Sequence, residues 1–127
     1  MKYLADSDVL IDHIRGRDRL GSSMITEGLG MSIISLGELL SGAYKSSNPE
    51  KSLKEIDQLF SLGITVENLS REVIDNYARI RVTLEKSGQR LDQFDLLIAA
   101  TAIMNNLTLI TRNKKHFQRI KGLKLAD

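Results

Sequence analysis

The sequence contains no cysteine and no tryptophan, and it has a single proline, Pro49, among 127 residues. The absence of cysteine excludes a disulfide scaffold, a thiolate zinc site, an iron–sulfur cluster and a cysteine nucleophile. With only two histidines, His13 and His116, histidine-rich metal sites are excluded as well. Any chemistry must therefore be built on carboxylates, hydroxyls and cationic side chains. A cysteine-free composition also fits a reducing, cytoplasmic location.

Long apolar stretches are also missing. No run approaches the roughly 18 apolar residues of a membrane-spanning helix, so no membrane partner is expected. An apolar fraction of 42% is ordinary for a packed globule and too high for a disordered chain. Residues 1–127 are expected to form one domain, because two hydrophobic cores rarely fit below roughly 150 residues.

The formal net charge of +2 hides an uneven distribution of basic and acidic residues. Residues 111–127 hold six Lys and Arg but only one acid, Asp127, and a second basic cluster consists of Arg15, Arg17 and Arg19. Basic clusters that are separated from acids are typical of enzymes that bind polyanions. The alternative is that these residues form a solvated loop and tail.

The hydrophobic pattern alternates between strands and helices. We expect strands at residues 3–5, 30–35, 63–66, 107–111 and 123–125, and helices at 8–15, 36–43, 50–60, 70–86 and 92–104. The last of these helices is apolar on all sides, which predicts burial on most faces. Dense strand–helix alternation favours an α/β sandwich with a mostly parallel sheet.

Oxygen-bearing side chains follow several of the predicted strands. Asp6 ends the first strand, Glu38 lies in the first helical turn after the second, and Thr111 ends the fourth. Asp95 lies in the first turn of the apolar helix. Because ligands of open α/β sheets bind beyond the carboxyl ends of the strands, we expect these groups at one edge. Closely packed carboxylates repel one another, and their oxygens suit Mg²⁺ or Mn²⁺.

Each of these acids also has an ordinary structural explanation. Asp6 and Asp8 could cap the first helix, and Glu38 could interact favourably with a helix dipole. Asp92 is best explained as a helix N-cap. Two further residues of the first helix are expected at the surface: Asp12 in an ion pair with Arg15, and His13.

Four segments resemble the motif blocks of the PIN-domain ribonucleases. They are residues 3–12 (YLADSDVLID), 35–39 (SLGEL), 94–100 (FDLLIAA) and 109–117 (LITRNKKHF). Each block alone is weak, but their order, their spacing and the chain length agree together. Within the family the sequence is most similar to VapC-type toxins of bacterial and archaeal toxin–antitoxin systems. The resemblance implies a three-layer α/β/α fold with a parallel sheet of four or five strands, and Mg²⁺- or Mn²⁺-dependent hydrolysis of RNA.

The resemblance also assigns residues of the active site. It implies that Asp6, Glu38 and Asp95 are metal ligands and that Thr111 is the hydroxyl beside them. Two departures from the family pattern bear on the metal. Asp8 stands where the family more often has Asn, and Asn113 and His116 stand where it often has a fourth acid. Asp8 and Asn113 are therefore additional candidate ligands. The missing fourth acid is compatible with a single-ion site and leaves the choice between one and two metal ions open.

Partners follow from the same resemblance. The acidic centre would be flanked by basic residues that grip RNA phosphates, for which the candidates are Arg15, Arg17, Arg112, Lys114 and Lys115. The family implies a homodimer and a cognate VapB-type antitoxin, with candidate antitoxin contacts on the helices around residues 36–60.

Three alternatives remain open at this level. Asp6 and Asp8 after an apolar strand also resemble the nucleophile motif of haloacid-dehalogenase-like phosphatases, with Asp6 as the nucleophile. A receiver-like regulatory module would need an aspartate after the third strand, which the segment 63–67 does not supply. A catalytically degenerate PIN domain would bind RNA without cutting it.

Overall fold

The computed structural model describes all residues from Met1 to Asp127. The strands are β1 (Tyr3–Ala5), β2 (Leu29–Ser32), β3 (Thr65–Glu67), β4 (Thr108–Ile110) and β5 (Lys124–Leu125). The helices are α1 (Ser7–Ile14), α2 (Ser22–Glu27), α3 (Ile33–Lys45), α4 (Pro49–Ser61), α5 (Arg71–Lys86), α6 (Gln93–Met104) and α7 (Lys114–Phe117).

All five strands are parallel and lie in the order β3-β2-β1-β4-β5. β1 is central, with Leu4 paired to Gly30 of β2 on one side and to Leu109 of β4 on the other. Along the chain, β2 and β3 are added on one side of β1, and β4 and β5 are then added on the other side. The carboxyl end of β1 is therefore the topological switch point, where open parallel sheets bind their ligands.

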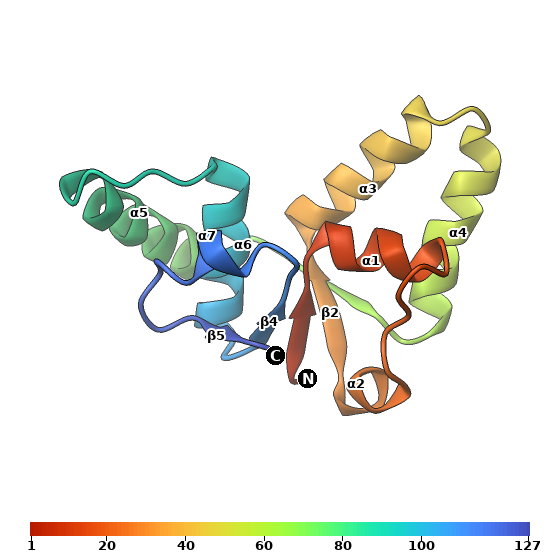
Figure 1. Cartoon of the computed structure of the whole chain (residues 1–127), viewed down its shortest axis with the longest axis horizontal. Coiled ribbons are helices and arrows are strands. Elements are labelled where there is room, and N and C mark those ends of the chain that lie inside the picture. Colours follow the sequence, from red (N-terminus) through yellow and green to blue (C-terminus); the bar gives the residue numbers. More distant parts are fainter.

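Helices cover both faces of the sheet (Figure 1). Successive residues of β1 point to opposite faces, so Leu4 joins one core with α5, α6 and α7, and Ala5 joins the other with α1, α3 and α4. Both residues are completely buried. This confirms the predicted three-layer α/β/α arrangement, with five strands in the sheet.

The apolar helix α6 is buried as its composition predicts. Ala99, Ala100 and Ala102 are fully inaccessible, and the helix packs mainly against α5. None of the helices is both long and apolar enough to cross a bilayer.

The junction between β2 and α3 differs from the sequence prediction. The strand ends at Ser32 rather than at residue 35, and α3 begins at Ile33. The β-branched pair Ile33–Ile34 is typical of a strand, but the buried Ser32 hydroxyl accepts the Ile34 N–H at 3.1 Å and caps a helix instead. Glu38 consequently lies in the second turn of α3, not in the first.

Smaller differences concern positions on helices. Helices α2 and α7 have no counterpart in the sequence prediction. His13, expected at the surface, is buried, and its Nδ1 accepts the N–H of Leu20 at 2.9 Å. The contact depends on the loop after α1 turning back to His13, and the local sequence pattern does not show this. Burial of the His13 ring could therefore not be predicted from the sequence.

Two serines of the β2–α3 junction give a matched test of this packing. Ser32 and Ser35 are both fully buried, but the Ser35 hydroxyl has no hydrogen-bond partner. Ser32→Ala should lower the free energy of unfolding by about 1 kcal/mol through loss of the cap. Ser35→Ala should be neutral or stabilising, since it removes an unsatisfied polar atom. Urea denaturation measures both; equal destabilisation by the two variants would contradict the assigned cap.

Candidate active site

Asp6 occupies the switch point at the end of β1. It is only 6% exposed, and it caps α1 by accepting the Ser7 N–H on Oδ1 at 2.8 Å. Its Oδ2 accepts the Thr111 hydroxyl at 3.0 Å. Thr111 reaches this point because β4, which it follows, pairs directly with β1. Both carboxylate oxygens are thus fixed by donors from two adjacent strand ends.

Glu38 is connected to this carboxylate through Ser7. The Ser7 hydroxyl donates to Glu38 Oε1 at 3.2 Å, while its backbone N–H holds Asp6. Ser7 is itself 6% exposed, so its position is fixed by packing. Sequence reasoning did not single out Ser7, which contacts two acids; its place directly after Asp6 was the available signal.

Asp95 completes the acidic group from the first turn of α6. It is half-buried, and the same turn is capped by Asp92, which accepts the Phe94 N–H as predicted. Burial raises the pKa of Asp95 to about 6, with further contributions from the negative charges of Asp6 and Asp92. The first turns of α1, α3 and α6 lie at the carboxyl ends of the strands in Figure 1, α1 and α3 over one face of the sheet and α6 over the other.

The other two carboxyls are destabilised in the same way. Burial raises the pKa of Asp6, against the opposing hydrogen bonds from Thr111 and Ser7. Partial desolvation raises the pKa of Glu38, and the charges of Asp6 and Asp95 add to the shift. Ionised oxygens that repel one another at a partly dry edge form a donor set suited to a hard divalent cation. As the side chains stand, no three Asp, Glu or His groups converge closely enough to hold an ion.

The turn after β4 carries a chain of hydrogen bonds away from Asp6. The Asn113 N–H donates to the Thr111 hydroxyl oxygen at 3.0 Å. The Asn113 amide nitrogen lies 3.0 Å from Nδ1 of His116 in α7. His116 is exposed, and its positive form lowers the pKa of Asp95. The segment 111–116 is therefore one connected unit at the rim of the acidic group.

Of the candidate phosphate-binding residues, the arginines Arg17 and Arg112 form ion pairs and the two lysines do not. Arg112 forms ion pairs with Asp12 and, at 2.7 Å, with Asp18. Arg17 pairs with Asp12 at 2.8 Å, so the expected Asp12–Arg15 pair is wrong. The turn at the end of α1, in which the Arg17 N–H donates to the Asp12 carbonyl at 2.9 Å, brings Arg17 rather than Arg15 to the Asp12 carboxylate. Lys114 and Lys115 form no ion pair.

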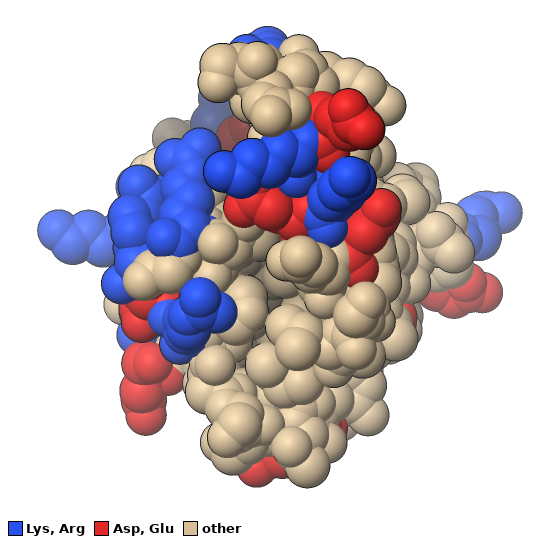
Figure 2. All heavy atoms as spheres, turned by 90° about the vertical axis from the view of Figure 1, so that its right-hand side faces the viewer, with Lys and Arg blue, Asp and Glu red and all other residues tan.

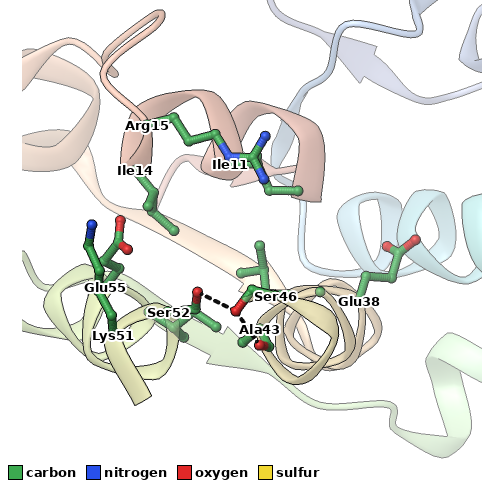
Figure 3. A pocket seen from close by; sticks show the side chains of 12 residues that line it. Ile11, Ile14, Arg15, Glu38, Ala43, Ser46, Lys51, Ser52 and Glu55 are labelled. Carbon is green, nitrogen blue, oxygen red and sulfur yellow. Dashed lines mark hydrogen bonds between the residues drawn. The ribbon is translucent and has the colours of Figure 1, made fainter. Parts of the chain in front are cut away.

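A groove of about 470 Å³ lies between α1, α3 and α4. Apolar groups from Ile11, Ile14 and Ala43 line it (Figure 3). Glu38 lies at one end, whereas Lys51 and Glu55 of α4 lie at the other. Figure 2 shows the face on this side of the molecule, where basic side chains gather around a smaller acidic group above a broad area without charges. The groove therefore leads directly to one of the three acids.

Comparison with known proteins decides the family. The family model described as "PIN domain" matches residues 3–123. The chain belongs to the PIN-domain family. This match spans all four motif blocks, and it excludes the phosphatase and receiver-like families.

Relatives that align over almost the whole chain identify the group within the PIN-domain family. The chain is 37% identical to "Ribonuclease VapC1" of Methanocaldococcus jannaschii, an alignment that covers 99% of this chain and 88% of the relative. It is 29% identical to the "tRNA(fMet)-specific endonuclease VapC" of Salmonella typhimurium, over 100% and 98% of the two chains. Its fold matches VapBC2 from Rickettsia felis, solved bound to a promoter DNA fragment, with a TM-score of 0.89, 29% identity and coverage of 99% and 98%. Within the PIN-domain family, the chain belongs to the VapC ribonucleases.

The raised pKa of Asp95 predicts how the metal-free protein responds to pH. A carboxyl whose folded pKa of about 6 exceeds its ordinary value of 3.8 destabilises the fold increasingly as pH rises between these values, and fully above them. Asp95→Asn should therefore stabilise the metal-free protein at pH 7 by on the order of 1 kcal/mol, allowing for solvent screening of a half-exposed group. The gain should vanish near pH 4.

Thermal unfolding in EDTA at both pH values measures this effect. Asp75→Asn is a suitable control, because Asp75 is exposed and only pairs with Arg79 on α5. It should change stability little at either pH. A lower unfolding temperature for Asp95→Asn at pH 7 would mean that the Asp95 carboxylate stabilises the fold.

Proposed function

We propose that this VapC-family chain, with residues 1–127 forming one PIN domain, is a metal-dependent endoribonuclease and the toxin of a VapBC-type pair. The observation that carries the proposal is the group of three carboxyls with raised pKa values, Asp6, Glu38 and Asp95, around the switch point of the sheet. RNA phosphodiester bonds would be hydrolysed there by a metal-activated water.

Asp6, Glu38 and Asp95 would hold Mg²⁺ or Mn²⁺, with Asp8 and Asn113 as secondary candidate ligands. When bound, such an ion neutralises phosphate charge and lowers the pKa of water. Thr111 and Ser7 orient the Asp6 carboxylate through the hydrogen bonds on its two oxygens. Glu38 or Asp95 orients the attacking water or accepts its proton, since both carboxyls are shifted towards neutral pKa values.

The activity is tested by cleavage of RNA with and without divalent metal. Wild type should cut single-stranded RNA in Mg²⁺ or Mn²⁺ and stop in EDTA. Asp6→Asn and Asp95→Asn should each lower the rate of RNA cleavage about a hundredfold or more, because each removes a charged group from the reacting centre. Asp75→Asn should remain active. Cleavage that persists in EDTA would contradict the proposal, and RNA binding without cleavage by wild type would favour the degenerate PIN domain.

The basic residues would then hold the RNA backbone. Lys114 and Lys115 are the candidates available for phosphate, because Arg17 and Arg112 are already paired with Asp12 and Asp18. Arg15 lines the groove beside Glu38 and could reach RNA or another partner there. Arg17 and Arg112 contact phosphate only by exchanging their carboxylate partners.

Salt dependence of RNA binding separates these roles. Each lost phosphate contact lowers the slope of log affinity against log salt by about 0.7 on single-stranded RNA. Lys114→Gln with Lys115→Gln should therefore lower the slope by about 1.4. The control double variant Lys54→Gln with Lys86→Gln removes the same charge from α4 and α5. Equal slopes for the two double variants, measured by fluorescence anisotropy in EDTA, would contradict the assignment.

The proposed antitoxin partner would occupy the groove between α1, α3 and α4. A peptide in this groove would bury Ile11 and Ile14 and end beside Glu38, which would block the acidic centre. Gly42 also lines the groove, and a Cβ atom placed on it would meet no other atom within 4 Å. A large side chain at this position can therefore enter the groove without displacing the core.

Gly42→Trp is therefore expected to preserve RNA cleavage while weakening inhibition by the cognate antitoxin about tenfold or more, because the ring fills the groove. Titration of cleavage with the cognate VapB-type antitoxin measures this. Ala78→Trp adds the same ring to an exposed position of α5, on the other face of the sheet, and should leave inhibition unchanged. Unchanged inhibition of Gly42→Trp would place the antitoxin elsewhere.

A homodimer acting in the cytoplasm is the remaining part of the proposal. Tyr44 and Phe94 are 67% and 51% exposed and leave apolar surface available on α3 and α6. Sedimentation of the free protein at several concentrations tests the dimer.

A further inference from the structure

Among the groups that most affect the pKa values of Asp6, Glu38 and Asp95, one can carry a positive charge, and it is not a Lys or Arg. None of the main electrostatic influences on Asp6, Glu38 or Asp95 comes from a Lys or Arg, whereas His116 acts on Asp95. The nearest arginine in sequence, Arg112, is held by Asp12 and Asp18. An RNA phosphate entering this edge meets repelling carboxylates, so a hydrogen-bond donor at the rim would be needed to offset that repulsion.

The orientation of the His116 ring is determined by its neighbours. Asn113 is fixed by its own N–H bond to Thr111, and its side-chain amide donates to Nδ1 of His116 at 3.0 Å. A neutral imidazole that accepts on Nδ1 carries its proton on Nε2. No protein group bonds Nε2, and His116 is exposed. The ring therefore presents an N–H donor at the rim that carries Asp95.

We propose that His116 binds a phosphate oxygen of the RNA substrate through Nε2–H, and that Asn113 is the positioning residue that fixes this tautomer. The inference rests on the proposed nuclease function and assigns a phosphate contact within it. It also gives a role to the position at which this chain departs from the family pattern: a donor to substrate in place of a fourth acid. The Asn113 side chain then acts through His116 rather than on the metal.

Steady-state kinetics of wild type, His116→Leu and His116→Gln test the contact between His116 and phosphate. A hydrogen bond to a charged partner is worth about tenfold or more in binding, so His116→Leu should raise KM for RNA about tenfold and leave kcat nearly unchanged. His116→Gln places an amide N–H near the position of Nε2 and should recover most of the loss. Unfolding temperatures should be equal, because the side chain is exposed.

Metal binding distinguishes this role from ligation. Mn²⁺ affinity, measured by electron paramagnetic resonance of the free ion, should be the same for wild type and His116→Leu. A weaker affinity in the variant would overturn the inference by making His116 a metal ligand. Equal KM values for wild type and His116→Leu, with cleavage intact, would overturn it while leaving the proposed function standing.

The tautomer is tested directly by ¹⁵N NMR of the imidazole rings at about pH 8, where an ordinary imidazole is neutral. His116 should carry its proton on Nε2, and its ring signals should shift when a single-stranded RNA oligonucleotide is added in EDTA. His13, the only other histidine, is buried and should not respond. Asn113→Ala should allow both tautomers of His116. A ring protonated on Nδ1 in wild type, or one insensitive to RNA, would contradict the proposal whether or not the protein cleaves RNA.

Discussion

A buried carboxylate at the end of the central strand is the constraint on which the rest of the site depends. Removing an ionised group from water is costly unless donors replace the solvent, and Asp6 obtains them from the Ser7 N–H and the Thr111 hydroxyl. Thr111 can serve only because β4 returns to lie beside β1. Asp6 therefore connects the central strand to the start of α1 and to the turn after β4.

The same arrangement explains how charge is distributed. Ser7 brings Glu38 towards Asp6, and α6 adds Asp95. The charge of Asp6 raises the pKa values of Glu38 and Asp95, and burial raises all three, which favours a cation. The basic side chains do not neutralise this group. Arg17 and Arg112 are held by Asp12 of α1 and Asp18 of the loop after it, which keeps the centre negative while the margin stays basic.

Much of this site could be predicted from the sequence, because Asp6 and Thr111 end apolar strand segments and strand ends meet at one edge of a parallel sheet. The start of α3 could not be predicted, because Ile33–Ile34 favours a strand locally. The helix begins there because the buried Ser32 hydroxyl caps it. The Arg112–Asp18 pair joins residues 94 positions apart, and no local pattern encodes it.

The central claim is that Asp6, Glu38 and Asp95 together bind one divalent ion. Crystals soaked in Mn²⁺ and measured at the manganese absorption edge test it most directly. One anomalous peak is expected between these three side chains, with carboxylate oxygens about 2.1 Å away. Saturating Mn²⁺ that gives no peak there, or a peak bound by other residues, would contradict the claim.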